Sequence, residues 1–272
     1  MEIHAIEPLV TIITPTYNQG QFIEATIKSV LAQTYKNIEY IVIDAMSTDG
    51  TVKILELYNN QIIKIIREPD EGQSDAIVKG FKMAKGELIG WINSDDLLYS
   101  DCIEKVVAVY KETPDAVLFY NSKMDILAED GSYKKLVNVP LISRDHLLRI
   151  ETNLIQPGSF YTKSALVKVD YFNRKLKYSM DLDLWLRLLN VGRFVDIGSN
   201  PIAGYREWEG TKTSTGSLTL LKERKKLLII HGACSTDKTI NNIKIELIKH
   251  HIKAIPYVGK FCKVFVNFFR NI

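Results

Sequence analysis

Residues 88–96 have the sequence Leu88-Ile89-Gly90-Trp91-Ile92-Asn93-Ser94-Asp95-Asp96, an apolar run that ends in two adjacent carboxylates. The apolar part predicts a buried strand, because short runs of this kind are typical of parallel sheets. Neighbouring carboxylates raise one another's pKa unless a cation neutralises them, and Mg²⁺ and Mn²⁺ prefer carboxylate oxygens and phosphates. The stretch therefore predicts a metal–diphosphate site with Asp95 and Asp96 as metal ligands. A solvated turn is the alternative.

Around this stretch, the first 120 residues alternate short apolar runs with amphipathic ones. We predict strands at Leu9–Thr14, Ile38–Asp44, Ile62–Arg67, Glu87–Asn93 and Ala116–Tyr120. We predict helices at Gln21–Gln33, Thr51–Tyr58, Ser74–Ala84 and Asp101–Lys111, the last opened by a capping-box-like pair, Asp101 and Glu104. Repeated β-α-β units imply an α/β fold with a parallel, doubly wound sheet.

Polar and aromatic residues follow several of the predicted strands. In doubly wound sheets, ligands bind at the carboxyl ends of the strands. The segments at those ends are Pro15-Thr16-Tyr17-Asn18, Asp44, Arg67-Glu68-Pro69-Asp70 and Asn93–Asp96. Together they bring an aromatic ring, acidic groups and a guanidinium to one edge, and a nucleoside diphosphate requires such a set.

Composition is that of an ordinary soluble globular protein, with 272 residues of which 46% are hydrophobic and 25% charged. The length allows one large domain or two small ones. The three cysteines lie far apart, which predicts neither a disulfide framework nor a zinc site and favours a reducing cytosol. The first residues lack signal-peptide features and no apolar run approaches the ~18–20 residues of a spanning helix, so we expect a cytoplasmic protein.

The second half of the chain is harder to interpret. Residues Asp125–Asn153 are polar and turn-rich, which leaves an acceptor-side loop and a mobile lid as alternatives. Within Gln156–Gly216, the run Met180–Leu188 predicts the start of an amphipathic helix with Asp181 and Asp183 in its first turn. Acidic residues at that place often serve only as helix caps, which is the alternative for both.

Charge is distributed unevenly along the chain. From Lys222 onward, eleven lysine and arginine residues face three acidic ones, a net charge of +8 that leaves −5 for the first 221 residues. Residues Ile255–Arg270 place phenylalanines on one side and basic residues beside them, a pattern suited to an anionic membrane surface. The alternative is that these aromatic residues dock on the preceding part of the protein.

Taken together, the motifs resemble the family 2 inverting glycosyltransferases with the GT-A fold. The resemblance covers roughly residues 8–215, in the family's order and at its spacing. The residues that carry it are Thr14–Asn18, Ser29–Thr34, Ile43-Asp44, Ser47–Thr51, Glu71–Ala76, Gly86-Glu87, Asn93–Asp96, Gln156–Gly158 and Met180–Arg187.

The resemblance implies a GT-A fold, a Rossmann-like and mostly parallel central sheet with flanking helices. Residues 1–217 would form the catalytic domain, with a nucleotide-sugar half at about 8–120 and an acceptor half at about 121–217. Residues 218–272 would form a basic helical extension. The implied activity is non-processive inverting transfer of a single sugar from a nucleotide-diphospho-sugar to a glycan or lipid-linked acceptor, and the expected donor is a UDP-sugar. Cell-surface polysaccharide assembly fits this activity, on the inner face of the membrane and without a nucleic-acid partner.

The resemblance also implies site residues. Tyr17 would lie near the base, Asp44 would accept from the nucleoside, and Asp181 would be the catalytic base, with Arg187 at the expected interval. The nucleotide-sugar set is Pro15, Tyr17, Asn18, Asp44, Arg67, Asp75 and Asp95, and Asp95 and Asp96 would bind Mn²⁺ or Mg²⁺. Acceptor or diphosphate contacts are expected from Gln156, Asp183, Arg206, Trp208 and Lys212.

Two positions depart from the family pattern. Ala45-Met46 replaces the usual second acidic or glycine position after the second predicted strand. Trp208 stands where the family commonly has a histidine that helps to hold the diphosphate or metal, which puts metal affinity in doubt. Arg206 and Lys212 are the candidates to replace it electrostatically.

Other functions fit the sequence less well. A nucleotidyltransferase would need a glycine-rich phosphate loop after the first strand, and Pro15–Gly20 is not one. A dehydrogenase would need a Gly-x-Gly-x-x-Gly motif, which does not open the first helix. A catalytically inactive sugar-nucleotide-binding protein is the remaining alternative, and Asp181 argues against it. Processive synthases of the family carry transmembrane helices and a Gln-x-x-Arg-Trp motif, and neither is found, which favours single-sugar transfer.

Overall fold

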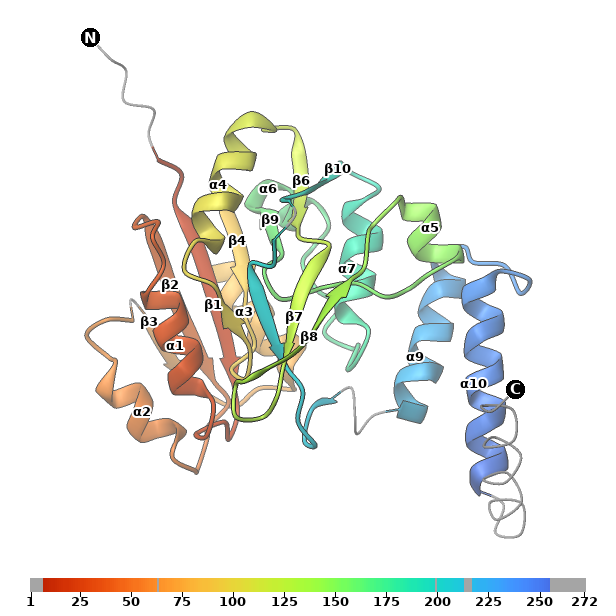
Figure 1. Ribbon diagram of the computed structural model, residues 1–272, viewed down its shortest axis with the longest axis horizontal. Coiled ribbons are helices and arrows are strands. Elements are labelled where there is room, and N and C mark those ends of the chain that lie inside the picture. Colours follow the sequence, from red (N-terminus) through yellow and green to blue (C-terminus); the bar gives the residue numbers. More distant parts are fainter. Residues whose placement is uncertain (1–6, 63, 199, 213–216, 255–272) are drawn as a thin grey trace.

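The structure is a computed structural model that describes residues 7–62, 64–198, 200–212 and 217–254. Its larger sheet has seven strands in the order β10-β6-β9-β4-β1-β2-β3 (Figure 1). The strands are β1 Val10–Thr16, β2 Ile38–Asp44, β3 Lys64–Arg67, β4 Leu88–Trp91, β6 Ala116–Tyr120, β9 Phe160–Thr162 and β10 Arg193–Asp196. Strand β9 runs antiparallel to β4 and β6, and the other paired strands are parallel. The predicted mostly parallel α/β sheet is confirmed.

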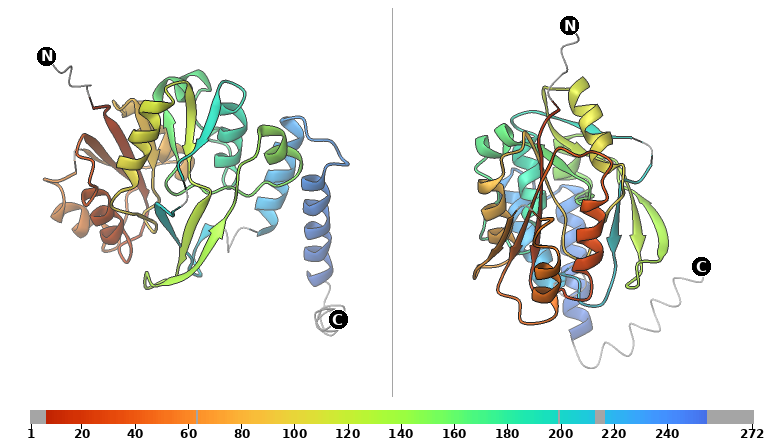
Figure 2. Two further views of the ribbon diagram at one scale, coloured as in Figure 1. Left: turned by 45° about the horizontal axis from the view of Figure 1, so that its top comes forward. Right: turned by 90° about the vertical axis from the view of Figure 1, so that its left-hand side faces the viewer.

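Helices cover both faces of this sheet (Figure 2). Helices α1 Ile23–Leu31, α2 Thr51–Leu57 and α4 Cys102–Glu112 share one hydrophobic core, and α3 Gln73–Met83, α6 Lys163–Lys168 and α7 Met180–Leu188 share the other. Successive side chains of a strand point to opposite faces, so Tyr40 and Val42 of β2 enter the first core. Ile41 and Ile43 enter the second core. This arrangement is the doubly wound sheet that the sequence predicts.

Within the segment Asp125–Asn153, predicted as a loop or a lid, Asp125–Leu127 and Tyr133–Asn138 instead belong to a second, four-stranded sheet. The sheet has the order β5-β11-β7-β8, with β5 Leu97–Leu98, β11 Ala203–Arg206, β7 Lys123–Leu127 and β8 Tyr133–Asn138. Helix α5, Arg144–Arg149, follows it. Most residues of β8 are exposed, so this strand lacks the apolar alternation by which sequence identifies a half-buried strand.

The predicted capping box at helix α4 is wrong. The side chain of Asp101 accepts no capping hydrogen bond, and its φ of −99° and ψ of 7° are not the extended conformation typical of an N-cap. Asp101 pairs with Lys105 at 2.7 Å, and Glu104 accepts a hydrogen bond from the Thr34 hydroxyl at 2.6 Å. Both carboxylates are therefore occupied by other partners.

Two further helices, α9 Ser217–Ile230 and α10 Lys238–Ala254, pack against the part of the protein that precedes them (Figure 1). Leu227 and Leu228 of α9 and Ile240 of α10 are buried in the same core as Trp185 of α7. This part of the predicted basic extension thus shares the core of the residues that precede it. The phenylalanine-rich pattern at 255–270 lies outside the described residues. In the part of the chain that the structure describes, no helix has the length and apolar character needed to cross a membrane.

Candidate active site

A cavity of about 950 Å³ lies at the carboxyl ends of strands β1 to β4, where the sequence predicts a ligand site. This volume is in the range of pockets that hold small molecules and cofactors. Seven predicted site residues line it, namely Pro15, Tyr17, Asp95, Gln156, Asp181, Trp208 and Lys212. Seven other predicted site residues are not among its lining residues, namely Asn18, Asp44, Arg67, Asp75, Asp96, Asp183 and Arg206.

One end of the cavity, at the loops after β1 and β2, carries two exposed apolar or aromatic side chains. Tyr17 is 59% exposed and Met46 is 46% exposed, and both line the cavity. Met46 has a φ of 60°, a left-handed conformation that few residues other than glycine and asparagine adopt. A base ring of a nucleoside can stack on such a surface.

Asp44 lies outside the cavity lining and fixes the loop that carries Met46. Its side chain is fully buried, accepts hydrogen bonds from the backbone and hydroxyl of Ser47, and pairs with Arg67 at 2.8 Å. Asn18 accepts from the backbone of Thr48, while its own N–H donates to Ser47 Oγ. These three predicted residues hold the turns after β1 and β2 together.

Asp75 lies in the first turn of α3, away from the cavity lining. Its carboxylate pairs with Arg174 at 3.1 Å and with Lys79 at 3.4 Å, and accepts from the backbone of Glu71. Burial raises the pKa of Asp75, but these partners outweigh it and hold that pKa below its usual value. Asp75 thus fixes the start of α3 to a neighbouring loop.

The two adjacent carboxylates, Asp95 and Asp96, have different surroundings in the structure. Asp96 is fully buried, and its oxygens accept hydrogen bonds from the backbone of Arg206 at 2.9 Å and the amide of Asn93 at 3.0 Å. Asp95 lines the cavity, and one oxygen accepts from the indole N–H of Trp208 at 2.9 Å. Burial raises the pKa of both carboxyls, and the charge of Asp95 raises that of Asp96 further.

Of the two cations proposed to replace the family's histidine, Lys212 is the one at the cavity. Its ammonium group donates to Gln73 Oε1 and to the carbonyl of Lys177, both at 2.9 Å. Arg206 is 4% exposed, donates to the backbone carbonyls of Asp95 and Glu129, and lies 5.0 Å from the ring centre of Phe22. Arg206 therefore stabilises the loop that carries Asp95.

The carboxylate oxygens of Asp95 suit a divalent ion whose remaining ligands come from the substrate and water. Among the described residues, no group of three or more histidine, cysteine or acidic side chains is placed to hold a metal. Mg²⁺ in particular is usually bound by one or two carboxylates, substrate phosphates and water. One cavity-lining carboxylate, Asp95, beside a space that can accept a diphosphate, meets that requirement.

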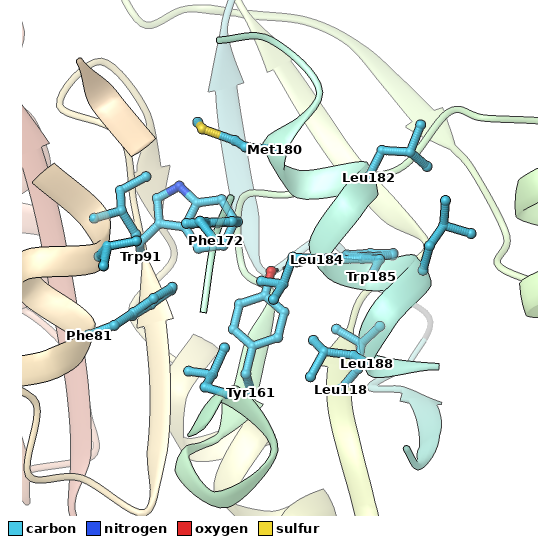
Figure 3. Close-up of a cluster of buried hydrophobic side chains, with 14 of the residues drawn as sticks. Phe81, Trp91, Leu118, Tyr161, Phe172, Met180, Leu182, Leu184, Trp185 and Leu188 are labelled. Atoms are coloured by element: carbon cyan, nitrogen blue, oxygen red, sulfur yellow. Dashed lines mark hydrogen bonds between the residues drawn. The ribbon is translucent and has the colours of Figure 1, made fainter. Parts of the chain in front are cut away.

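Asp181 is the second residue of α7 and lines the cavity. Burial raises its pKa, and this effect exceeds the opposing effects of the Leu182 N–H and of the positive charges of Arg224 and Lys212. Figure 3 shows the hydrophobic cluster in which α7 is anchored, with Trp185 and Tyr161 fully buried and joined by a hydrogen bond of 3.0 Å. Asp181 therefore stands on a rigid element.

Asp183 is not brought to the cavity. Its carboxylate is 2.7 Å from Arg187 Nη2 and 2.9 Å from His231 Nε2. Burial raises the pKa of Asp183, but His231 and Arg187 outweigh it and lower that pKa. Asp183 thus connects α7 to the residues that follow α9.

Helix α9 contributes to the site in a way that the sequence analysis missed. Leu220 and Arg224 line the cavity. Glu223 accepts hydrogen bonds from the backbone N–H groups of Lys177, Tyr178 and Ser179 at 2.8, 2.8 and 2.7 Å. Glu223 therefore fixes the residues just ahead of Asp181. In the sequence, Glu223 and Arg224 stand out only as part of the run of charges that begins at Lys222.

Comparison with known proteins identifies the family of this chain. Residues 11–168, more than half of the chain, match the family model described as glycosyl transferase family 2. The chain belongs to this family, which sets aside the nucleotidyltransferase alternative.

Two curated relatives illustrate the similarity. An uncharacterized glycosyltransferase of Rickettsia typhi is 32% identical over 202 residues, which cover 70% of this chain and 62% of the relative. The chondroitin synthase of Pasteurella multocida is 29% identical over 229 residues, which cover 84% of this chain and 23% of the synthase. The chain thus spans less than two thirds of the length of either relative.

Solved structures confirm the GT-A fold. Residues 1–349 of S. aureus TarS, in complex with UDP-GlcNAc, align with a TM-score of 0.68 at 19% identity, covering 90% of this chain and 73% of that TarS fragment. The mannosyltransferase PcManGT from Pyrobaculum calidifontis, in complex with GDP-Man and Mn²⁺, gives a TM-score of 0.57 at 18% identity, covering 94% and 74%. At sequence identities of 18–19%, the similarity to these two structures shows a shared fold and nothing more.

The Glu223→Ala substitution is expected to weaken both the fold and the activity. It removes a carboxylate that accepts three backbone hydrogen bonds, so the free energy of unfolding should fall by about 2–4 kcal/mol. The segment ahead of Asp181 should then become less well positioned, and transfer should slow by about 10-fold or more. Lys222→Ala, an exposed position on the same helix, is the control. Urea unfolding midpoints that are equal in the two variants would contradict this role.

Proposed function

We propose that this glycosyltransferase moves one sugar from a nucleotide-diphospho-sugar to a hydroxyl of a glycan or lipid-linked acceptor, with inversion at the anomeric carbon. The observation that supports this most is that Asp181 and Asp95 line one cavity, together with the loops after β1, β2 and β3. Inversion requires a base on the side of the anomeric carbon opposite the leaving group. A separate carboxylate then remains for the diphosphate side.

In the proposed reaction, Asp181 accepts the proton of the acceptor hydroxyl while its oxygen attacks the anomeric carbon. The bond from that carbon to the diphosphate breaks, and the nucleoside diphosphate leaves with the electron pair. The raised pKa of Asp181 makes its carboxylate a stronger base than an ordinary aspartate. Lys212, also at the cavity, neutralises part of the charge that develops on the diphosphate.

Asp95 is the proposed ligand of Mn²⁺ or Mg²⁺. When bound, such an ion would neutralise charge on the leaving diphosphate. The indole N–H of Trp208 holds one oxygen of Asp95 and so orients the carboxylate. Hydrogen bonds of this kind to a ligating group typically tune metal affinity.

For the donor, we propose a UDP-sugar. TarS binds UDP-GlcNAc and PcManGT binds GDP-Man and Mn²⁺, which supports a nucleotide-sugar donor for a chain of the same fold. The exposed Tyr17 and Met46 offer a surface for the base. The similarity to a chondroitin synthase supports a role in polysaccharide assembly.

A thermal-shift screen of UDP-, GDP- and dTDP-sugars, with and without Mn²⁺, tests the donor, because a bound ligand stabilises the protein by mass action. We expect one UDP-sugar to raise the melting temperature most, and more so with Mn²⁺. NMR of the transfer product then gives its anomeric configuration. Retained configuration would refute the inverting mechanism, and stabilisation by no nucleotide-sugar would refute the donor class.

We also propose that α9 and α10 bring the enzyme to the anionic cytoplasmic face of a membrane. Residues 218–254 carry eight lysine and arginine residues against three acidic ones. Ile230, Ile245 and Ile248 are 70%, 51% and 57% exposed on these helices. Figure 1 places the two helices at the end of the molecule opposite β3 and α2. Basic charge beside exposed apolar side chains suits an anionic lipid surface.

Vesicle co-sedimentation is expected to rise with the fraction of anionic lipid and to fall with salt, since each basic residue near the surface contributes about 1 kcal/mol. Replacing Ile230, Ile245 and Ile248 by serine should weaken sedimentation several-fold. Leu57→Ser is the matched control, because Leu57 is 69% exposed on the distant helix α2. Sedimentation that is insensitive to lipid charge, or equal in the two variants, would refute membrane binding.

A further inference from the structure

Helix α9 places an under-satisfied guanidinium in the cavity. Arg224 lines it, and its Nη1 donates to Thr152 Oγ1 across a long 3.5 Å. Its Nε is buried without a hydrogen-bond partner among the described residues. A guanidinium has five N–H donors, and those of a buried arginine are normally satisfied. Its Nη2 makes no hydrogen bond among the described residues and is not a buried atom, so this nitrogen retains its donors for a ligand.

The acidic neighbours of Arg224 do not neutralise it through direct pairing. Glu223, the preceding residue, is occupied by three backbone N–H groups. No salt bridge of Arg224 is found within the described residues. Arg224 is partly buried. Partial burial of an arginine without a carboxylate partner carries a cost, and an anionic ligand would compensate that cost.

Arg224 lies on the acceptor side of the cavity. In both Figure 1 and Figure 2, α7 lies between α9 and the strands β1 to β3. The nucleoside end, with Tyr17 and Met46, follows β1 and β2, whereas Asp181 begins α7 and Arg224 belongs to α9. Inverting transfer brings the acceptor to the anomeric carbon from the side opposite the diphosphate, which is the side of Asp181. A group bound by Arg224 thus belongs to the acceptor.

We propose that the acceptor carries an anionic group, a carboxylate or a phosphate, and that Arg224 binds it with Thr152 as a neutral partner. The planar guanidinium suits both groups, since each can accept two parallel hydrogen bonds from it. The carboxylate would come from an acidic sugar, and the phosphate from a sugar, polyol or lipid phosphate. The inference rests on the proposed function, because it takes Asp181 as the base that the acceptor must reach.

Matched pairs of small ligands test this subsite on the full chain with UDP bound. Methyl β-glucuronide is compared with methyl β-glucoside, and glycerol 3-phosphate with glycerol, by ligand-detected NMR titration. We expect at least one anionic member to bind about 10-fold or more tightly than its neutral match. The pair that shows the difference identifies carboxylate or phosphate as the source of the charge.

Substitutions at Arg224 then test whether this residue causes the preference for anionic ligands. Arg224→Gln should remove the anion preference, and Arg224→Lys, which keeps the charge but not the planar fork, should reduce it several-fold. Lys226→Gln, an exposed position on the same helix, should leave the preference unchanged. Melting temperature and UDP affinity are measured for each variant, and both should stay close to those of the wild type. If Arg224→Gln does not fold, the Arg224→Lys result decides.

Equal binding of anionic and neutral ligands by the wild type would overturn the proposal. So would an anion preference that survives Arg224→Lys unchanged, or one that falls equally in Lys226→Gln. Turnover of the nucleotide-sugar is assayed separately. Absence of turnover with an intact anion preference would refute the proposed function and leave the anion site standing. Turnover without an anion preference would refute only the anion site.

Discussion

The Asp181→Asn variant is expected to transfer sugar at least about 10²-fold more slowly than the wild type while binding the donor with unchanged affinity. Asparagine has nearly the same shape as aspartate but cannot accept the proton of the acceptor hydroxyl. Asp181 stands at the start of a helix whose Leu184 and Trp185 are fully buried, so the substitution should not displace the surrounding site. Initial rates at saturating donor and acceptor, with calorimetry of donor binding, measure both effects.

The same substitution should stabilise the fold near neutral pH. Burial raises the pKa of Asp181 in the folded state, so folding is favoured when this carboxyl is protonated. That contribution is fully present below the unfolded pKa of about 4 and is lost as the pH rises through the higher folded pKa. Near neutral pH the desolvated carboxylate of Asp181 therefore destabilises the protein, and asparagine removes this charge. We expect a higher melting temperature for Asp181→Asn than for wild type, with a difference that shrinks toward pH 4.

The pH dependence of the wild-type rate follows from the same shift. As the pH falls through the raised pKa of Asp181, the base becomes protonated and transfer should decline, at a higher pH than for an ordinary aspartate. Asp183→Asn is the control, because Asp183 pairs with Arg187 and His231 outside the cavity. That variant should lose stability with a milder effect on rate. Wild-type turnover by Asp181→Asn would place the base elsewhere.

The sequence predicts the central sheet well because its strands are buried on both faces. The run Ile38–Asp44 is apolar except for Glu39 and Asp44, and its bounds coincide with those of strand β2. Strand β8 was missed because it is largely exposed and shows no apolar pattern. Apolar runs in the sequence thus identify strands that have a buried face and fail to identify strands that do not.

The site is only partly predictable, because the roles of neighbouring residues depend on partners far away in the chain. Asp95 and Asp96 look alike in the sequence, yet the backbone of Arg206, 110 residues later, accounts for one oxygen of Asp96 and leaves Asp95 at the cavity. Glu223 and Arg224 belong to a run of charges without amphipathic periodicity. Their separate contacts, with the segment before Asp181 and with the cavity, become visible only when α9 is packed.

The Asp95→Asn variant is expected to bind UDP in the presence of Mn²⁺ about 10²-fold more weakly than the wild type, a loss at the upper end of that seen for groups that only support a metal ligand. Asparagine keeps an oxygen that can accept from the Trp208 indole, so the loop should stay in place. It lacks the negative charge that a hard divalent ion prefers. Calorimetric titration of UDP, with Mn²⁺ and with a chelator, measures the metal-dependent part of the affinity.

Two further variants decide whether Asp95 itself carries this effect. Asp96→Asn should retain the Mn²⁺ dependence, because the side chain of Asp96 is buried and bonded to Asn93 and the backbone of Arg206. Trp208→Phe keeps a ring against Phe22, 4.9 Å away between ring centres, but removes the N–H that orients Asp95. It should weaken Mn²⁺-dependent binding by about 10-fold, as expected for a supporting residue. Unchanged Mn²⁺ dependence in Asp95→Asn, or an equal loss in Asp96→Asn, would show that Asp95 is not the metal ligand.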